Sequence, residues 1–106
     1  MTRARWIAKP ERLSSTAKTI WDYYSVGLEK EGRLTPETAE SFRLLCEILA
    51  VAHAAAAEIE RFGVTIEAKS GARRANPALQ TLMTTQREAE KLLSEFGLSI
   101  RGQIRL

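Results

Sequence analysis

The sequence contains few of the residues on which metal and redox chemistry depend. Its 106 residues include one cysteine, Cys46, and one histidine, His53. A single cysteine excludes an intramolecular disulfide, and one cysteine with one histidine excludes a Cys/His zinc site within one chain. The longest apolar run without a charge, residues 48–57, is too short to span a bilayer. No apolar stretch follows the arginines near the N-terminus, so we expect neither a secretory signal nor a membrane association.

The overall composition is that of one folded domain. Hydrophobic residues make up 44% of the chain and charged residues 27%, which is typical of a folded protein rather than a disordered tail. A chain of this length suffices for a single domain with a modest core. We therefore expect a small intracellular protein that acts in the cytoplasm.

The apolar residues recur at helical spacing in three segments. They predict helices over residues 15–31, 36–62 and 77–96. The expected fold class is all-α: a long central helix and an antiparallel third helix joined by a basic loop, with a shorter N-terminal helix folded across them. Residues 64–68 alternate apolar and polar side chains before the turn signal Ser70-Gly71, so the loop is expected to contain at most a small hairpin.

Each predicted helix begins at a recognisable start signal. Ser14 or Ser15 can cap the first helix. Thr35-Pro36 combines a capping residue with a proline, which predicts that Thr35 caps the second helix and Pro36 occupies its first position. Asn76-Pro77 repeats this signal, so we expect Asn76 to cap the third helix.

The second half of the long helix is unusual because residues 50–57 are almost all alanine. Such small side chains allow another helix to approach closely but leave too little apolar bulk for a thick core. A short chain also gains stability when assembly buries further surface. We therefore predict a homo-oligomer, and the residues expected at its interface are Leu45, Leu49, Ala52, Ala56 and Ile59.

The charges are arranged in blocks around an acidic middle, although the net charge is only +3. Residues 1–20 hold five bases and one acid, residues 63–76 three bases and one acid, and residues 97–106 two bases. Basic blocks of this kind either solvate the surface or contact phosphate. The residues that we predict to contact DNA are Arg3, Arg5, Lys9, Arg12, Lys69, Arg73, Arg74, Arg101 and Arg105. Residues 1–13 would form a basic N-terminal arm, and residues 14–106 a helical domain for oligomerisation and DNA binding.

Residues suited to catalysis are scarce, and we predict no enzyme, no metal and no cofactor. His53 lacks a partner at the spacing that a general base needs, and we interpret it as a packed or interfacial side chain. Cys46 is interpreted as a small core residue. Residues 70–74 lack the spaced glycines and the lysine of a nucleotide-binding loop. Residues 15–35 imitate the start of a helix-turn-helix, but the helix that follows is far too long for a recognition helix.

From Leu34 onward the chain resembles the small subunit of phage terminase, in the lineage of phages with cohesive ends. The segments that carry the resemblance are Leu34–Pro36, Phe42–Glu47, Gly63 with Lys69–Gly71, Asn76–Leu79, and Glu95–Ser99 with Arg101 and Arg105-Leu106. The chain departs from the family pattern at Ser99-Ile100, where Thr-Pro is usual, and at Gly102-Gln103, where a serine precedes the final arginine and leucine.

This resemblance implies a non-catalytic viral DNA-packaging factor. Members of the family are helical, assemble into rings, bind the viral double-stranded DNA and hand it to the large terminase subunit, which holds the ATPase and the nuclease. The expected location is the cytoplasm of the host bacterium. The alternative from the residues alone is a helical adaptor or regulatory oligomer without a direct DNA role.

Overall fold

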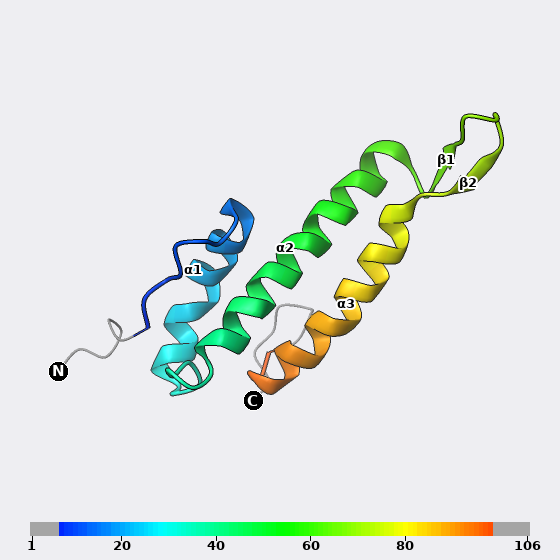
Figure 1. Cartoon of the computed structure of the whole chain (residues 1–106). Helices are drawn as coiled ribbons and strands as arrows, with labels where there is room; N and C mark the ends of the chain where they lie inside the picture. The colour runs from blue at the N-terminus through cyan, green and yellow to red at the C-terminus, as the bar shows by residue number, and fades with distance from the viewer. Residues whose placement is uncertain (1–6, 99–106) are drawn as a thin grey trace.

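A computed structural model describes residues 7–98, which form three helices and one hairpin (Figure 1). In chain order these are α1 (Ser15–Lys30), α2 (Ala39–Phe62), β1 (Thr65–Glu67), β2 (Arg73–Ala75) and α3 (Pro77–Glu95). α2 and α3 lie side by side and antiparallel, and α1 packs against the first half of α2 (Figure 1). The three predicted helices are confirmed. The all-α class is corrected to a mainly helical fold, because the basic loop contains a two-stranded antiparallel sheet.

Two helices begin where the capping signals in the sequence predict. Ser14 caps α1, and its Oγ accepts a hydrogen bond of 3.2 Å from the backbone N–H of Ala17. Asn76 caps α3, and its Oδ1 accepts from the N–H of Ala78 at 3.0 Å. Both side chains satisfy a backbone donor that the helix itself leaves without a partner.

The start of α2 corrects the sequence prediction, because the helix begins at Ala39 rather than at Pro36. The N–H of Thr35 donates to Thr38 Oγ1 at 2.9 Å, and the N–H of Thr38 donates to the Thr35 carbonyl at 3.0 Å. These bonds close a separate turn over residues 35–38, and the first helical bond runs from the N–H of Phe42 to the carbonyl of Thr38. Thr35 Oγ1 also accepts from the N–H of Thr38 at 3.3 Å, so the side-chain bond expected of Thr35 forms within this turn, and Thr38 takes the cap position of α2.

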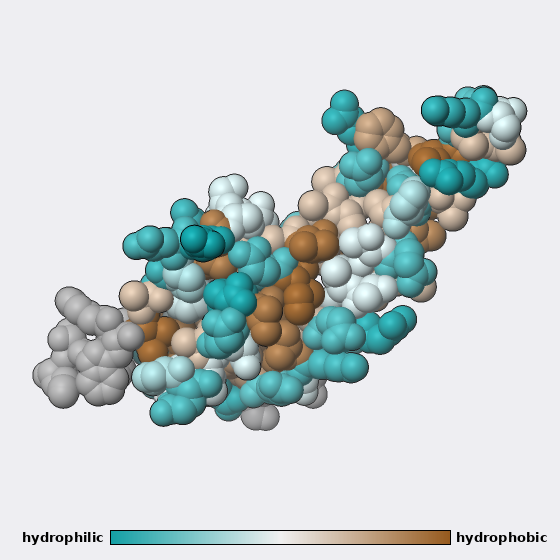
Figure 2. Space-filling view, in the orientation of Figure 1, coloured by the Kyte–Doolittle hydropathy of each residue, from teal (hydrophilic) through white to brown (hydrophobic). Residues whose placement is uncertain are grey.

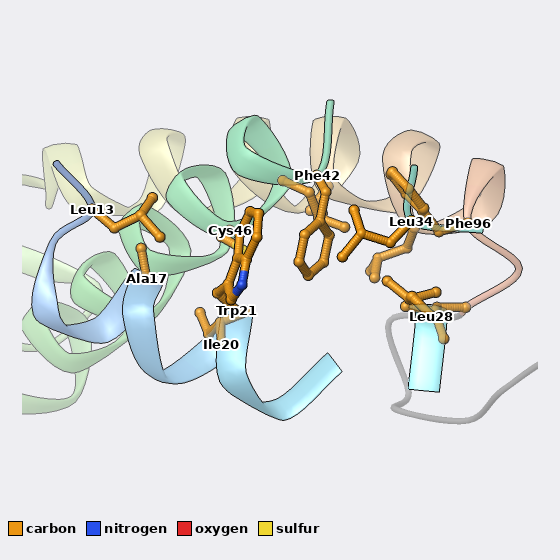
Figure 3. Close-up of a cluster of buried hydrophobic side chains, with 13 residues drawn as sticks. Leu13, Ala17, Ile20, Trp21, Leu28, Leu34, Phe42, Cys46 and Phe96 are labelled. Carbon is orange, nitrogen blue, oxygen red and sulfur yellow. The ribbon is translucent and has the colours of Figure 1, made fainter. Parts of the chain in front are cut away.

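The hydrophobic core lies at one end of the molecule, where all three helices meet (Figure 3). Phe42 is fully buried at its centre. Its ring centroid lies 4.6 Å from that of Trp21 on α1 and 5.7 Å from that of Phe96 at the end of α3. Tilted and edge-on aromatic contacts at these distances are favourable beyond the area that they bury. The contacting rings of Trp21, Phe42 and Phe96 therefore connect α1, α2 and the end of α3.

The opposite half of the molecule has no comparable core. Beyond the first turn of α1, the described chain consists of α2 and α3 packed against each other, followed by the hairpin (Figure 1). The buried apolar residues of α2 in this half are Ala52 and Ala55, whose side chains are single methyl groups. The prediction that the alanine-rich segment lacks bulk for a thick core is confirmed.

The hairpin pairs Thr65 with Ala75, Ile66 with Arg74 and Glu67 with Arg73. At its tip the N–H of Ala68 donates to the Ala72 carbonyl at 2.8 Å, and Gly71 has a φ of +90°. A positive φ of this size suits glycine, which has no Cβ to clash with the backbone. The alternating segment 64–68 therefore forms one strand, and the turn at Ser70-Gly71 returns the chain to form the second.

Asn76 closes the hairpin at its root. Besides capping α3, it donates from Nδ2 to the carbonyl of Gly63 at 2.9 Å and from its backbone N–H to the carbonyl of Val64 at 2.8 Å. The side chain is only 4% exposed, so these bonds lie away from water. The end of α2 and the start of α3 are thus fixed to each other by one amide.

We predict that Asn76→Ala lowers the free energy of unfolding by about 2 kcal/mol, because it removes a helix cap and leaves the Gly63 carbonyl without its donor. Asn76→Ser is the matched control: serine retains the cap but is too short to reach Gly63, so about half of the loss is expected. Denaturant unfolding at one fixed protein concentration measures both variants. Equal stability of the alanine variant and the unmodified protein would contradict the assigned bonds.

The two glycines Gly97 and Gly27 are expected to respond to alanine in opposite directions. Gly97 has a φ of +76°, and a Cβ there would overlap the guanidinium of Arg33, which pairs with Glu31 at 3.1 Å. Gly97→Ala should therefore lower stability by about 1–2 kcal/mol. Gly27 lies inside α1 with open space around it, so Gly27→Ala should raise stability by up to about 1 kcal/mol. Thermal melts of both variants test the pair, and a shift of the same sign would contradict it.

Candidate nucleic-acid interface

The hairpin carries three basic side chains to the far end of the molecule. Lys69, Arg73 and Arg74 are all exposed, and Glu67 is the acid that accompanies them. Figure 2 shows hydrophilic side chains on the outer part of the hairpin and apolar ones at its root. The three bases lie on an element that projects beyond the paired helices α2 and α3 (Figure 1). A projection with excess positive charge is suited to contact a phosphate backbone.

The two arginines of β2 differ in their surroundings. Side chains of neighbouring residues on a strand point to opposite faces, so Arg73 shares a face with Thr65 and Glu67, whereas Arg74 shares a face with Ile66. Nη2 of Arg73 donates to the carbonyl oxygen of Thr65 at 2.9 Å and to its Oγ1 at 2.7 Å. The guanidinium of Arg73 is therefore held in one position by β1.

The other predicted DNA contacts are not brought to the hairpin. Lys9 and Arg12 lie in the segment beside α1 (Figure 1), and Nζ of Lys9 forms an ion pair of 3.0 Å with Asp22. This segment packs on the helical body, because Leu13 is buried in the core and Ile7 lies against it. A carboxylate already compensates the charge of Lys9. Four predicted contacts lie outside the described residues: Arg3, Arg5, Arg101 and Arg105.

Two apolar grooves lie along the α2–α3 pair. The first, which we call the hairpin groove, has a volume of about 600 Å³ and is lined mainly by Val51, Ala54, Phe62, Ile66, Pro77 and Thr81. The second, which we call the α1 groove, has a volume of about 420 Å³ and is lined mainly by Ile20, Tyr23, Leu49, Ala52, Ala56 and Leu82. Figure 2 shows apolar side chains over the middle of the molecule.

The grooves lie on opposite sides of the α2–α3 pair. Ala54 lines the hairpin groove and Ala56 lines the α1 groove. Positions two residues apart lie about 200° apart around a helix, so the two alanines face away from each other. Phe62 and Val51, which line the hairpin groove, are 51% and 45% exposed. Tyr23 of α1, which lines the α1 groove, is 74% exposed. Large exposed apolar side chains that line a groove are typical of surfaces that another protein covers.

The residues predicted for an oligomer interface take three different positions. Leu49, Ala52 and Ala56 line the α1 groove, although Ala52 is only 8% exposed. Ile59 is partly buried on α2. Leu45 is fully buried in the core of the single chain, so it has no surface with which to contact a second copy.

The chemistry of Cys46 and His53 gives no support to catalysis. Cys46 is a core residue, as predicted, and desolvation raises the pKa of its thiol to about 12, with a further contribution from the Glu47 carboxylate. The thiol therefore stays protonated and poorly nucleophilic at neutral pH. His53 is exposed at the edge of the α1 groove. Among residues 7–98, no three histidine, cysteine or acidic side chains lie close enough together to hold a metal ion.

Sequence reasoning missed three features of this region. It did not identify Thr65 as the partner of Arg73, and it did not foresee the contact of Asn76 with Gly63. It also passed over Arg61, whose guanidinium lies 5.0 Å from the ring centroid of Phe62 at the root of the hairpin. A cation above an aromatic face is a weak but favourable contact. The adjacent pair Arg61-Phe62, directly before a glycine, is the signal that could have indicated it.

No helix in the described part of the chain is both long and apolar enough to cross a membrane.

Comparison with known proteins places the chain in a family. The family model described as phage terminase, small subunit, matches residues 17–106. No curated protein and no solved structure gives a significant match. Since the match covers nearly all of α1 and the whole of α2, the hairpin and α3, this chain belongs to the phage terminase small-subunit family.

Proposed function

We propose that this protein is the non-catalytic, DNA-binding subunit of a viral packaging machine. In this function it assembles into a homo-oligomer, binds viral double-stranded DNA and presents it to the large terminase subunit, which supplies the ATPase and the nuclease, in the cytoplasm of the host bacterium. Family membership establishes a role in phage DNA packaging. The observation that carries the finer proposal is the projecting hairpin with exposed Lys69, Arg73 and Arg74.

The position of the apolar surface supports assembly through unlike faces. A symmetric dimer would use one groove of each copy and leave the other groove in water. A head-to-tail contact between the hairpin groove of one copy and the α1 groove of the next covers both, and it closes into a ring when the rotation between copies divides a full turn. Leu49, Ala52 and Ala56 then contribute to the contact from one side, and Val51 and Phe62 from the other.

A ring would strengthen a weak basic site. Cyclic symmetry places every copy of the hairpin on one circle, so DNA meets several basic tips at once. Each additional contact with the same duplex is intramolecular, and the total affinity exceeds that of one hairpin by orders of magnitude. Three bases per copy therefore give the assembled ring a higher affinity than a single chain, whose net charge is only +3.

Two measurements on the unmodified protein test this function. Light scattering or native mass spectrometry should give the mass of several chains, that is, a whole-number multiple of 11.8 kDa greater than one. Anisotropy of a labelled duplex, titrated at several salt concentrations, should show binding whose affinity falls as salt rises. An oligomer that does not bind duplex DNA even at low salt would overturn the DNA role and favour the alternative, a helical adaptor.

A further inference from the structure

We infer that Thr65 is a positioning residue that holds the guanidinium of Arg73 ready to contact DNA phosphate. The inference rests on the proposed DNA-binding function and adds a specific role for a neutral residue outside the basic block. Arg73 would touch the DNA, whereas Thr65 would act through Arg73 without touching DNA itself.

The register of the hairpin places the two side chains together. Thr65 pairs with Ala75, and Arg73 pairs with Glu67, so Thr65 and Arg73 are diagonal neighbours on the same face of the sheet. Diagonal neighbours lie within reach of a long side chain. Both acceptors of Thr65 are used: the carbonyl oxygen lies 2.9 Å and Oγ1 lies 2.7 Å from Nη2 of Arg73. One nitrogen of the guanidinium is thus fixed by two acceptors of one residue.

The choice of partner preserves the positive charge of Arg73. Glu67 stands directly opposite on β1, yet among residues 7–98 no ion pair joins it to Arg73. A carboxylate would neutralise the guanidinium, whereas a hydroxyl and a carbonyl orient it and leave its charge available. Within the same residues, no protein group accepts a hydrogen bond from Nε or Nη1 of Arg73. These donors match the planar geometry with which arginine binds phosphate.

Orientation before binding has a measurable consequence. An exposed arginine samples many rotamers, and ordering such a side chain on binding weakens affinity by about two- to tenfold. When Thr65 holds Arg73 in one conformation, the side chain has already lost this freedom in the free protein, and DNA binding does not have to order it. Removing the hydroxyl should therefore weaken DNA binding without changing how many phosphates are neutralised.

The test compares Thr65→Val, Thr65→Ser and Arg73→Ala in the full-length protein, with a labelled duplex of mixed sequence titrated at several salt concentrations. Valine keeps the shape and strand preference of threonine but lacks the hydroxyl, and serine retains the hydroxyl as the matched control. We expect Thr65→Val to weaken binding by about two- to tenfold with an unchanged salt slope, and Thr65→Ser to bind like the unmodified protein. Arg73→Ala should weaken binding and reduce the slope by about 0.9 per engaged subunit.

The double variant Thr65→Val/Arg73→Ala decides whether the hydroxyl acts through Arg73. If it does, the double variant binds as Arg73→Ala does, because the hydroxyl has nothing left to position. Additive losses, or unchanged affinity of Thr65→Val while Arg73→Ala weakens binding, would overturn the inference and leave the proposed function standing. Unchanged binding in both Arg73→Ala and Arg74→Ala would instead count against the hairpin as the DNA contact. Thermal melts and native masses verify that each variant folds and assembles.

Discussion

Replacing Arg73 and Arg74 together with alanine should weaken binding to every duplex and flatten its salt dependence. Each phosphate neutralised by a basic side chain contributes about 0.9 to the slope of log affinity against log salt. Loss of both arginines should therefore lower the slope by about 2 per engaged subunit. Because an oligomer engages several hairpins on one duplex, the losses multiply, and this variant should show the largest defect in DNA binding.

A matched variant separates a local contact from a general loss of charge. Arg87→Ala/Lys91→Ala removes the same two charges from exposed positions on α3, away from the hairpin. This control should retain most of the affinity and slope, because charges that lie outside the contact are screened by salt. Equal losses in the two double variants would contradict the hairpin contact. The same titrations on a protein that lacks residues 1–12 test the separate prediction that the N-terminal basic block contributes.

Substituting glutamate at either groove should abolish assembly, since it places a buried charge in an apolar contact. Ala56→Glu alters the α1 groove and Ala54→Glu the hairpin groove. Both alanines are exposed in the single chain, so the fold itself should tolerate the change. They are better probes than Ala52, whose low exposure means that glutamate there would also disturb the packing of α2 on α3. We expect native masses at or near that of one chain.

Mixing the two variants distinguishes unlike faces from a symmetric contact. The Ala54→Glu protein retains an intact α1 groove, and the Ala56→Glu protein retains an intact hairpin groove. Head-to-tail assembly therefore predicts that an equal mixture forms pairs of one copy of each and nothing larger. Ala57→Glu is the control, because Ala57 is exposed but lines neither groove, and this variant should keep the native mass. An unchanged mass for both groove variants would show that these faces are open to water.

The sequence predicted best what local interactions decide. The caps at Ser14 and Asn76 involve acceptors and donors two or three residues apart. Asn76 was predicted, and Ser14 is one of the two serines that the sequence offered. The helical spacing of the apolar residues likewise predicted the three helices, which the structure places at Ser15–Lys30, Ala39–Phe62 and Pro77–Glu95. Such features depend on helical geometry and on neighbouring residues, which the sequence displays directly.

The predictions that failed depended on competition or on distant partners. Thr35 was expected to cap α2, but Thr38 draws it into a separate turn. A small hairpin was allowed for, but its second strand, Arg73–Ala75, has no apolar alternation of its own and could not be located before its pairing with residues 65–67 was known. Leu45 was assigned to an oligomer interface, yet it fills the core of one chain. Helical periodicity shows which side of a helix is covered, and it is silent on whether the same chain or another copy covers it.

The hydrogen bonds of Asn76 separate the hairpin from the helical body. Because Asn76 joins the end of α2 to the start of α3, residues 64–75 leave and re-enter the helical body at one fixed point, the root of the hairpin. A longer, shorter or differently charged segment can be inserted there without changing the aromatic contacts of Phe42 with Trp21 and Phe96 at the opposite end of the molecule. Loop-closure entropy changes only slowly with length, so such exchanges cost little stability. Under the proposed function, exchanging only the outer residues 67–74 would therefore change the DNA contact while Ile66, which lines the hairpin groove, is retained.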